Sequence, residues 1–427
     1  MIQIPHNFEP YPYQKQILEN DARFKVVVLH RRSGKSKTAL NEMLRRAVGK
    51  PGVYCYVFPH YNQVKKAIWL DPDMLSHHLP NEIVIKKNEA EMYIKIQAIG
   101  GESLIYFLGA DKPENVLGMR FDGVVLDEYA QMKEDFWIRI IRPIIGKSGG
   151  WVMFVFTPEG KNHAWKLLQQ AKEKSDWAWW VLGINDTRDD QGRPLFPVQE
   201  IEAIKRDTPE AMFDQEYNVA FIDNATSAFR KAKELMIDPE RCKTGLFGTK
   251  DDPHQLGVDL AKYQDWTVVA GCNLEKSHIR IIDRCQLVGW TEQKARIHNH
   301  VKAHNTRNIV MDSTGVGDPI VDDLKLLGLR ITPFKFTEST RDLLLRNLAV
   351  KIENAIITFE YDKGLLEEFE AMRYELEGRR VVVRAPSGIH DDRVMAVALS
   401  VWEMEKVPRS DQRNTVYTIG KKPYLNL

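Results

Sequence analysis

The stretch Val26-Val27-Val28-Leu29-His30-Arg31-Arg32-Ser33-Gly34-Lys35-Ser36 decides the fold of the first part of the chain. Its four aliphatic residues predict a buried strand. Residues 36–48 predict a helix, because their apolar side chains fall on one face and Gly49 follows as a stop. A strand, a loop ending in Gly-Lys-Ser and a helix form the context of a phosphate-binding loop, in which backbone N–H groups and the helix N-terminus face the phosphates.

The residues of this loop have separate expected roles. We expect Lys35 to reach the β and γ phosphates and Ser36 to coordinate magnesium. The other loop residues expected to bind the nucleotide are Arg31, Arg32, Ser33 and Gly34. The first glycine of the pattern GxxxxGK[ST] is replaced here by Leu29, so the tripeptide alone is a weak signal and the flanking strand and helix carry the prediction.

Paired carboxylates support the same site. Asp127 and Glu128 end the apolar run Gly123-Val124-Val125-Leu126, which predicts that Asp127 acts through the magnesium shell and that Glu128 orients and deprotonates water. The alternative is a solvated strand-to-loop junction. We also expect Gln14 to bond the adenine edge, with packing of the N-terminus as the alternative, and Thr157 to lie near the γ-phosphate, although Thr-Pro after a strand is also an ordinary turn.

Acids recur at strand ends in the second part of the chain. Asp259 and Asp312 lie at the ends of the predicted strands 256–260 and 309–311, and Asp391-Asp392 opens a predicted helix. An all-oxygen cluster selects Mg²⁺ or Mn²⁺, and two such ions can catalyse phosphodiester hydrolysis. Each aspartate alone could instead cap a helix or fill a turn. Residues 374–384 predict a hairpin that turns at Gly378 and presents arginines to DNA, with a solvated hairpin as the alternative.

Composition sets the broad class. The 427 residues exceed one compact core, and 43% hydrophobic with 28% charged residues is typical of packed domains. A net charge of +1 argues neither for nor against DNA. Four scattered cysteines, Cys55, Cys242, Cys272 and Cys285, indicate buried thiols in a reducing compartment. No apolar run is long enough to cross a membrane, and no secretion signal opens the chain.

The predicted domain boundary lies where the hydrophobic periodicity of the sequence fades. Strands alternate with helices from Lys25 to about Thr157, which predicts a mostly parallel sheet. We expect an ATPase domain over 1–221, a linker over 222–254, a nuclease domain over 255–405 and a basic tail over 406–427.

Taken in order, these motifs resemble one family. The series comprises the Arg-containing Gly-Lys-Ser loop, Val124-Val125-Leu126-Asp127-Glu128-Tyr129, Phe156-Thr157-Pro158, Gly257-Val258-Asp259, Asp312-Ser313-Thr314-Gly315-Val316-Gly317-Asp318 and His390-Asp391-Asp392-Arg393. The chain resembles the large terminase subunits of tailed bacteriophages from Tyr13-Gln14 to about Glu403. The resemblance implies an α/β fold with an ASCE-type ATPase (additional strand, catalytic glutamate), followed by an RNase H-like nuclease.

Function and partners are also implied. The family hydrolyses ATP to drive viral double-stranded DNA into procapsids and cuts the concatemer with Mg²⁺ or Mn²⁺. The resemblance implies a ring on the portal protein, a small terminase subunit that selects DNA, and a monomer in solution. It places the protein in the host cytoplasm and not in the mature virion. By position, Asp259, Asp312 and Asp391 correspond to the nuclease ligands, with Asp392 as an uncertain fourth.

One departure concerns charge supplied in trans. Similar terminases often read Leu-Arg-Gly before the second ATPase motif, whereas this chain reads Val116-Leu117-Gly118. We expect Arg120 to substitute and to reach a neighbouring subunit's nucleotide. Arg139, Arg142 and Arg31 are competitors, and a surface pair of Arg120 with Asp122 or Glu114 is the alternative.

Two other functions are compatible with the motifs. A repair or recombination ATPase fused to a nuclease would share both sites without packaging DNA. A DNA-binding scaffold would have lost ATP hydrolysis through the altered phosphate loop.

Overall fold

The computed structural model describes residues 7–222, 227–238, 247–249, 251–261, 265–315, 317–377, 380–386 and 389–404. The predicted tail, Cys242 and the hairpin turn at Gly378-Arg379 lie outside these residues. The chain forms two compact units. The first comprises Met1–Ala228 with Arg373–Arg384, and the second comprises Phe229–Met372 with Ala385–Leu427.

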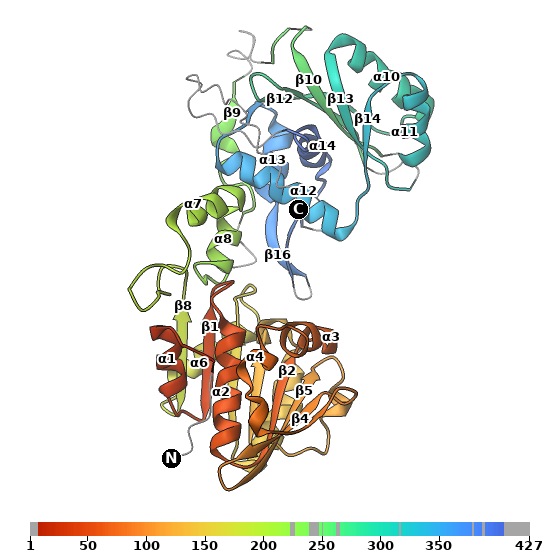
Figure 1. Cartoon of the computed structure of the whole chain (residues 1–427). Helices are drawn as coiled ribbons and strands as arrows, with labels where there is room; N and C mark the ends of the chain where they lie inside the picture. Colours follow the sequence, from red (N-terminus) through yellow and green to blue (C-terminus); the bar gives the residue numbers. More distant parts are fainter. Residues whose placement is uncertain are drawn as a thin grey trace, which may run out of the picture. The chain divides into compact units, whose positions relative to one another are not determined.

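The first unit is built on an eight-stranded sheet (Figure 1). Its order is β3-β4-β5-β2-β6-β7-β1-β8, and the strands from β5 to β8 along this order are parallel. The bounds are β1 Phe24–Leu29, β2 Val53–Phe58, β3 Val84–Asn88, β4 Tyr93–Ala98, β5 Gly101–Gly109, β6 Gly123–Asp127, β7 Trp151–Phe156 and β8 Trp177–Leu182. The prediction of a mostly parallel sheet is confirmed, and β7 lies between β1 and β6 as the additional strand of an ASCE fold.

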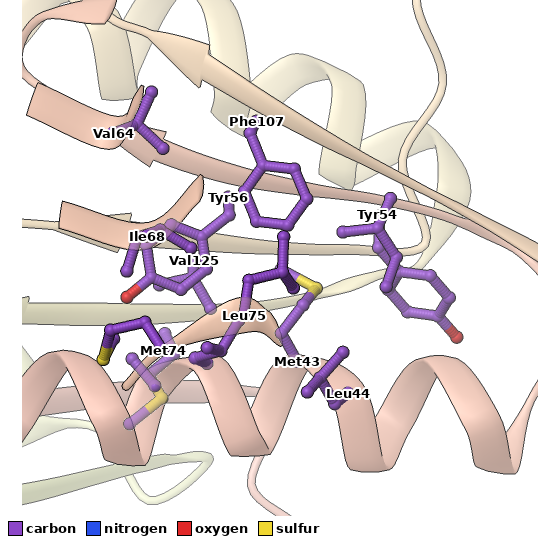
Figure 2. Close-up of a cluster of buried hydrophobic side chains, with 14 of the residues drawn as sticks. Met43, Leu44, Tyr54, Tyr56, Val64, Ile68, Met74, Leu75, Phe107 and Val125 are labelled. Carbon is purple, nitrogen blue, oxygen red and sulfur yellow. The ribbon is translucent and has the colours of Figure 1, made fainter. Parts of the chain in front are cut away.

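Helices cover both faces of this sheet. They are α1 Pro12–Glu19, α2 Lys35–Gly49, α5 Arg142–Ser148 and α6 His163–Glu173, with the short α3 Tyr61–Val64 and α4 Leu75–His78. The helices α7 Val198–Asp207 and α8 Glu210–Glu216 follow β8 and contact each other. Figure 2 shows Met43 and Leu44 of α2 directed at Tyr54, Tyr56 and Phe107 of the sheet. Because α2 packs on this face of the sheet, the position of the loop that precedes it is fixed.

The second unit contains a seven-stranded sheet of order β14-β13-β10-β11-β12-β15-β9. The bounds are β9 Met236–Ile237, β10 Pro253–Asp259, β11 Thr267–Asn273, β12 His278–Cys285, β13 Asn305–Asp312, β14 Ile331–Phe334 and β15 Thr358–Glu360. Strands β10, β11 and β12 form an antiparallel meander, and β13 adds parallel to β10. This is the layout expected of an RNase H-like domain.

Helices also cover both faces of the second sheet (Figure 1). They are α10 Trp290–Ala303, α11 Gly317–Leu326, α12 Glu338–Glu353, α13 Lys363–Ala371 and α14 Asp392–Ser400. Leu256 and Val258 of β10 pack in the apolar cluster that includes Ile297 of α10 and Val321 of α11. Gly257, between them, faces α14 on the other side of the sheet.

Three smaller predictions can be compared with the described residues. The antiparallel strands β16 (Arg373–Glu377) and β17 (Arg380–Arg384) form the expected hairpin. Cys55, Cys272 and Cys285 are free, buried thiols, as predicted. Within the described ranges, no helix has the length and apolarity needed to cross a bilayer.

Candidate functional sites

The loop between β1 and α2 adopts a conformation suited to phosphate. Arg32 and Gly34 have φ values of 64° and 76°, which turns successive backbone N–H groups toward one side. A Cβ at Gly34 would lie 2.9 Å from Nε2 of Gln14, so the loop needs glycine there. The hydroxyl of Tyr13 donates to the carbonyl of Ser33 and ties the loop to α1.

Ser33 offers a test of whether this loop fits a nucleotide. Its side chain is buried, and among the described residues its hydroxyl has no hydrogen-bond partner. An unpaired buried hydroxyl is costly unless a ligand uses it. Together with the N-terminus of the 15-residue helix α2, it fits a bound phosphate.

The paired acids lie at the carboxyl end of β6, beside this loop. Asp127 is fully buried and accepts hydrogen bonds from the hydroxyl of Tyr56 at 2.7 Å and from the N–H of Glu128 at 2.9 Å. The hydroxyl of Ser36 also bonds to it. Burial and the Glu128 carboxylate raise the pKa of Asp127 to about 6, against the opposing effect of Lys35. A serine hydroxyl and a buried aspartate in contact form a suitable magnesium site.

Glu128 and Lys35 are joined directly. Lys35 Nζ lies 3.0 Å from Glu128 Oε1. Burial lowers the pKa of Lys35, but the carboxylates of Glu128 and Asp127 outweigh it and the net shift is upward. Glu128 itself has a φ of 54°, a left-handed conformation that costs free energy in a non-glycine residue. Such strain at the end of a buried strand points to a constrained functional group.

The remaining predicted ATPase residues take different places. Thr157 donates to the carbonyl of Leu29 at 3.1 Å, which joins the ends of β7 and β1. Gln14 lies beside Gly34, and its amide oxygen accepts the N–H of Tyr11 at 2.9 Å. Arg31 is 62% exposed and pairs with Glu216 of α8 at 2.6 Å.

The candidate trans-acting arginines differ in how firmly they are held. Arg120 has a 77% exposed side chain and pairs with Asp122 at 3.7 Å. Arg139 pairs with Asp135 one turn earlier at 3.3 Å. The guanidinium of Arg142 lies over the ring of Phe24. Arg120 is therefore the least constrained of the three.

In the second unit, strand pairing brings two predicted acids together. Strands β10 and β13 are parallel, with Val258 opposite Met311, so Asp259 and Asp312 follow at the same edge of the sheet. The N–H of Thr314 donates to Asp312 Oδ1 at 2.8 Å, and the Thr314 hydroxyl also bonds this carboxylate.

Helix α14 brings the other acids. Asp391 is its N-cap residue and Asp392 its first residue. The helix backbone runs against β10, since a Cβ at Gly257 would lie 2.1 Å from the carbonyl oxygen of Ala396 and 2.2 Å from the N–H nitrogen of Ser400. This contact explains the glycine two residues before Asp259.

The four carboxylates create an electrostatic problem that a cation relieves. Burial raises the pKa of Asp259 well above its usual range, and the charges of Asp312, Asp392 and Asp391 raise it further. Burial also raises the pKa of each of the other three acids. Oxygen donors at strand ends and a helix N-terminus fit Mg²⁺ or Mn²⁺.

Two residues of this region were not predicted as ligands. The ligand atoms of Asp265, His390 and Asp392 all lie within 4.8 Å of one another. His390 Nδ1 is 3.3 Å from Asp265 and 3.7 Å from Asp392. Asp265 precedes β11 by two residues, where an aspartate is also an ordinary turn residue. The only local signal was its position six residues after Asp259.

Arg393 of the last motif has a structural place. Its guanidinium bonds Glu368 at 2.6 Å, and the same carboxylate accepts the N–H groups of Arg393 and Val394 at 2.9 and 3.1 Å. Glu368 thus caps α14 from α13 and fixes the helix that carries Asp391.

Comparisons with known proteins point to one family. A family model described as terminase large subunit, T4likevirus-type, N-terminal, matches residues 28–236. The large terminase subunits of Thermus phage G20c and Thermus virus P23-45 are 27% and 26% identical over 93% of this chain and 88% of theirs. The large terminase of a thermophilic bacteriophage has a similar fold in its crystal structure, with a TM-score of 0.54, 14% identity, and coverage of 92% of this chain and 99% of that one.

Proposed function

We propose that this chain is a phage large terminase subunit, which couples ATP hydrolysis to packaging of viral double-stranded DNA and cuts that DNA with a divalent metal. The observation that carries the proposal is one chain with two acid-based sites, one beside a phosphate loop and one at the edge of an RNase H-like sheet. The match to the terminase family model favours packaging over the repair or recombination alternative.

The first unit is the ATPase. The loop residues Arg31, Arg32, Ser33 and Gly34 with Lys35 bind the phosphates of ATP, and Ser36 with Asp127 holds Mg²⁺. Glu128 takes the proton of the attacking water once a phosphate draws Lys35 away. Thr157, bonded to the end of β1, passes the state of the site to β7. Gln14 supports Gly34 from α1 and lies near the nucleotide.

The second unit is the nuclease. Asp259, Asp312 and Asp391 bind the catalytic metal, Mg²⁺ or Mn²⁺, and Asp392 supports them as a further ligand. When bound, the metal activates water and stabilises the leaving oxygen. The chain's own part is to hold the oxygens in place through the β10–β13 register, the Gly257 contact and the Glu368 cap.

Assembly and location complete the proposal. The chain acts as a ring on the portal protein of a procapsid in the host cytoplasm, receives DNA from a small terminase subunit, and is monomeric before assembly. The first unit, Met1–Ala228 with Arg373–Arg384, forms the motor domain, and the second unit forms the nuclease domain. The range 222–254, expected as a linker, is divided between the two units and supplies β9 to the nuclease sheet. Residues 406–427 are a basic tail that binds a partner.

A direct experiment tests the function. The purified chain with DNA is expected to hydrolyse ATP, and with portal-bearing procapsids to protect DNA from added nuclease. No ATP hydrolysis with DNA present would favour the scaffold alternative. ATP hydrolysis and cutting without any DNA protection in procapsids would favour a repair enzyme.

Within the ring, Arg120 supplies positive charge to a neighbour's ATP. Its exposed, weakly paired side chain supports this role. An arginine acting in trans accelerates hydrolysis by about a thousandfold or more. Mixing Arg120→Ala subunits with Glu128→Gln subunits is expected to restore part of the ATPase activity, because some interfaces then pair an intact Arg120 with an intact Glu128. Wild-type hydrolysis by Arg120→Ala under packaging conditions would exclude this role.

A further inference from the structure

One positively charged side chain lies among the nuclease acids, and it belongs to none of the sequence motifs. Arg341, in the first turn of α12, contacts Asp391 Oδ2 through its Nη2 atom. Its charge also lowers the pKa of Asp259 against the strong upward shift from burial and the other acids. Arg341 therefore belongs to this site electrostatically as well as by contact.

The start of α12 is fastened to the acid cluster. The N–H of Phe336 donates to the hydroxyl of Thr314 at 2.9 Å, and the N–H of Thr314 donates to Asp312 at 2.8 Å. The helix has 16 residues and a Thr337 N-cap, so its positive end is oriented and ordered. Arg341 reaches the acids from a rigid support.

The guanidinium has binding capacity left. A guanidinium carries five N–H donors and favours two parallel bonds to a carboxylate or a phosphate. Arg341 reaches Asp391 through one nitrogen, and among the described residues its Nε is buried with no hydrogen-bond partner. The side chain is also 37% exposed, so a ligand can approach it.

Charge balance indicates which ligand this is. The four expected metal ligands carry four negative charges, which two divalent cations neutralise, and Asp265 beside Asp392 adds a fifth. A phosphodiester entering the cluster then brings a further uncompensated negative charge. Arg341 is a guanidinium in direct contact with one of these ligands.

We propose that Arg341 binds the DNA phosphate that enters the nuclease site, and that its contact with Asp391 is its resting position without DNA. This inference rests on the proposed nuclease function. A phosphate oxygen takes the free donors of the guanidinium, while Asp391 keeps its other oxygen for metal.

The test uses the full chain with R341Q, R341K and the control R346Q, which removes an arginine five residues later in α12 that pairs with Asp342 at 2.8 Å. Binding to a duplex oligonucleotide is measured in Ca²⁺ at several salt concentrations. R341Q is expected to reduce the slope of log affinity against log salt by about 0.9, the loss of one phosphate contact. R346Q and R341K are expected to keep the wild-type slope.

Metal binding and cutting separate this role from a structural one. Calorimetry is expected to show Mn²⁺ affinity in R341Q equal to or tighter than wild type, and cutting in Mg²⁺ is expected to fall roughly tenfold to a hundredfold. Weakened Mn²⁺ binding with an unchanged salt slope would mean that Arg341 only positions Asp391. Should R341Q not fold, R341K decides: several-fold slower cutting is expected because lysine lacks the fork, and wild-type cutting would overturn the proposal.

Failure of the nuclease function looks different. If the wild type and Asp259→Asn are equally inactive with Mg²⁺ and Mn²⁺, the nuclease proposal fails. If Asp259→Asn alone loses cutting while R341Q binds and cuts like the wild type, only the role of Arg341 fails.

Discussion

Asp127 is a buried carboxylate, and its neighbours determine how much free energy its ionisation costs. Tyr56, Ser36 and Lys35 stabilise its charged form, whereas burial and Glu128 oppose it more strongly. The pKa of Asp127 in the folded protein, about 6, exceeds its usual value of 3.8. The folded chain therefore holds this proton more tightly than the unfolded chain, and ionisation of Asp127 costs stability as pH rises between these values.

Replacing Asp127 by asparagine tests this linkage. Without nucleotide, Asp127→Asn is expected to melt above the wild type at pH 8, with the difference shrinking as pH falls through 6 toward 4. The difference shrinks because protonation at low pH neutralises Asp127 in the wild type, as the substitution does in the variant. Melting temperatures followed by circular dichroism across this range give the answer, and a difference independent of pH would contradict the expected ionisation.

Asp259 at the nuclease site is also a buried carboxylate with a raised pKa, and a bound metal ion would stabilise its charged form. Asp259→Asn is expected to abolish DNA cutting, keep ATP hydrolysis, and raise the melting temperature in EDTA because one repelling charge is lost. The stabilisation that Mn²⁺ gives the wild type should largely disappear, since a ligand stabilises only what it binds. Asp391→Asn is expected to behave alike and Asp392→Asn more mildly. Normal cutting by Asp259→Asn would refute the metal assignment.

The motifs pointed to acids, and tertiary contacts supplied their partners. Strand ends and a helix start could be predicted for Asp259, Asp312 and Asp391 because periodicity marks those elements. No sequence pattern joins Asp265 to His390, since their proximity depends on how α14 packs against the sheet. For the same reason, no sequence pattern joins Arg341 to Asp391.

At the scale of elements, α14 and β10 form the joint that sets the nuclease geometry. A missing side chain at Gly257 lets the helix backbone touch the strand two residues before Asp259. Glu368 holds the opposite end of this arrangement by capping α14. The separation of Asp259 from Asp391 is therefore fixed by backbone contact.

Gly257→Ala tests the joint. A methyl group there meets backbone atoms at about 2 Å, which neither element can move aside alone. Overpacking of this kind costs roughly 1–3 kcal/mol, or more where backbone must shift. Denaturant unfolding is the measurement, with Gly289→Ala as control because no atom lies within 4 Å of its Cβ position. Equal stability of the two variants would show that α14 yields easily.

Buried strands were predictable and edge strands were not. Strands β2 and β7 are fully apolar, buried runs bounded by turns, which is the pattern that marks an inner strand. Strand β8 is only partly buried, and its run of Trp177, Trp179 and Trp180 does not by itself separate a strand from a helix. Strand β3 is exposed and polar, so it gives no hydrophobic signal.

For the whole molecule, the two sites lie in different units and use no residue in common. Lys35 and Glu128 belong to the first unit, and the Asp259 cluster belongs to the second. Chemistry at one site is therefore separable from chemistry at the other.

Lys35→Ala in the full chain tests this separation. ATP hydrolysis and packaging are expected to be lost, because an alanine cannot reach the β and γ phosphates as the Lys35 Nζ does, while Mn²⁺-dependent cutting of plasmid DNA continues at a rate within about threefold of wild type. Asp259→Asn serves as the reciprocal control. Equal loss of both activities in Lys35→Ala, with an unchanged melting temperature, would show that the sites are coupled.

The order in which the chain visits its two units has a practical consequence. It leaves the first unit after Ala228, returns at Arg373 for the β16–β17 hairpin, where Arg373 bridges Ser227, and departs again after Arg384. A protease nick at the first crossing would thus give two incomplete halves. The N-terminal half would lack the β16–β17 hairpin, and the C-terminal half would carry this hairpin without its bridge to Ser227. Grafting either half onto another protein requires deciding which of them inherits twelve borrowed residues, Arg373–Arg384.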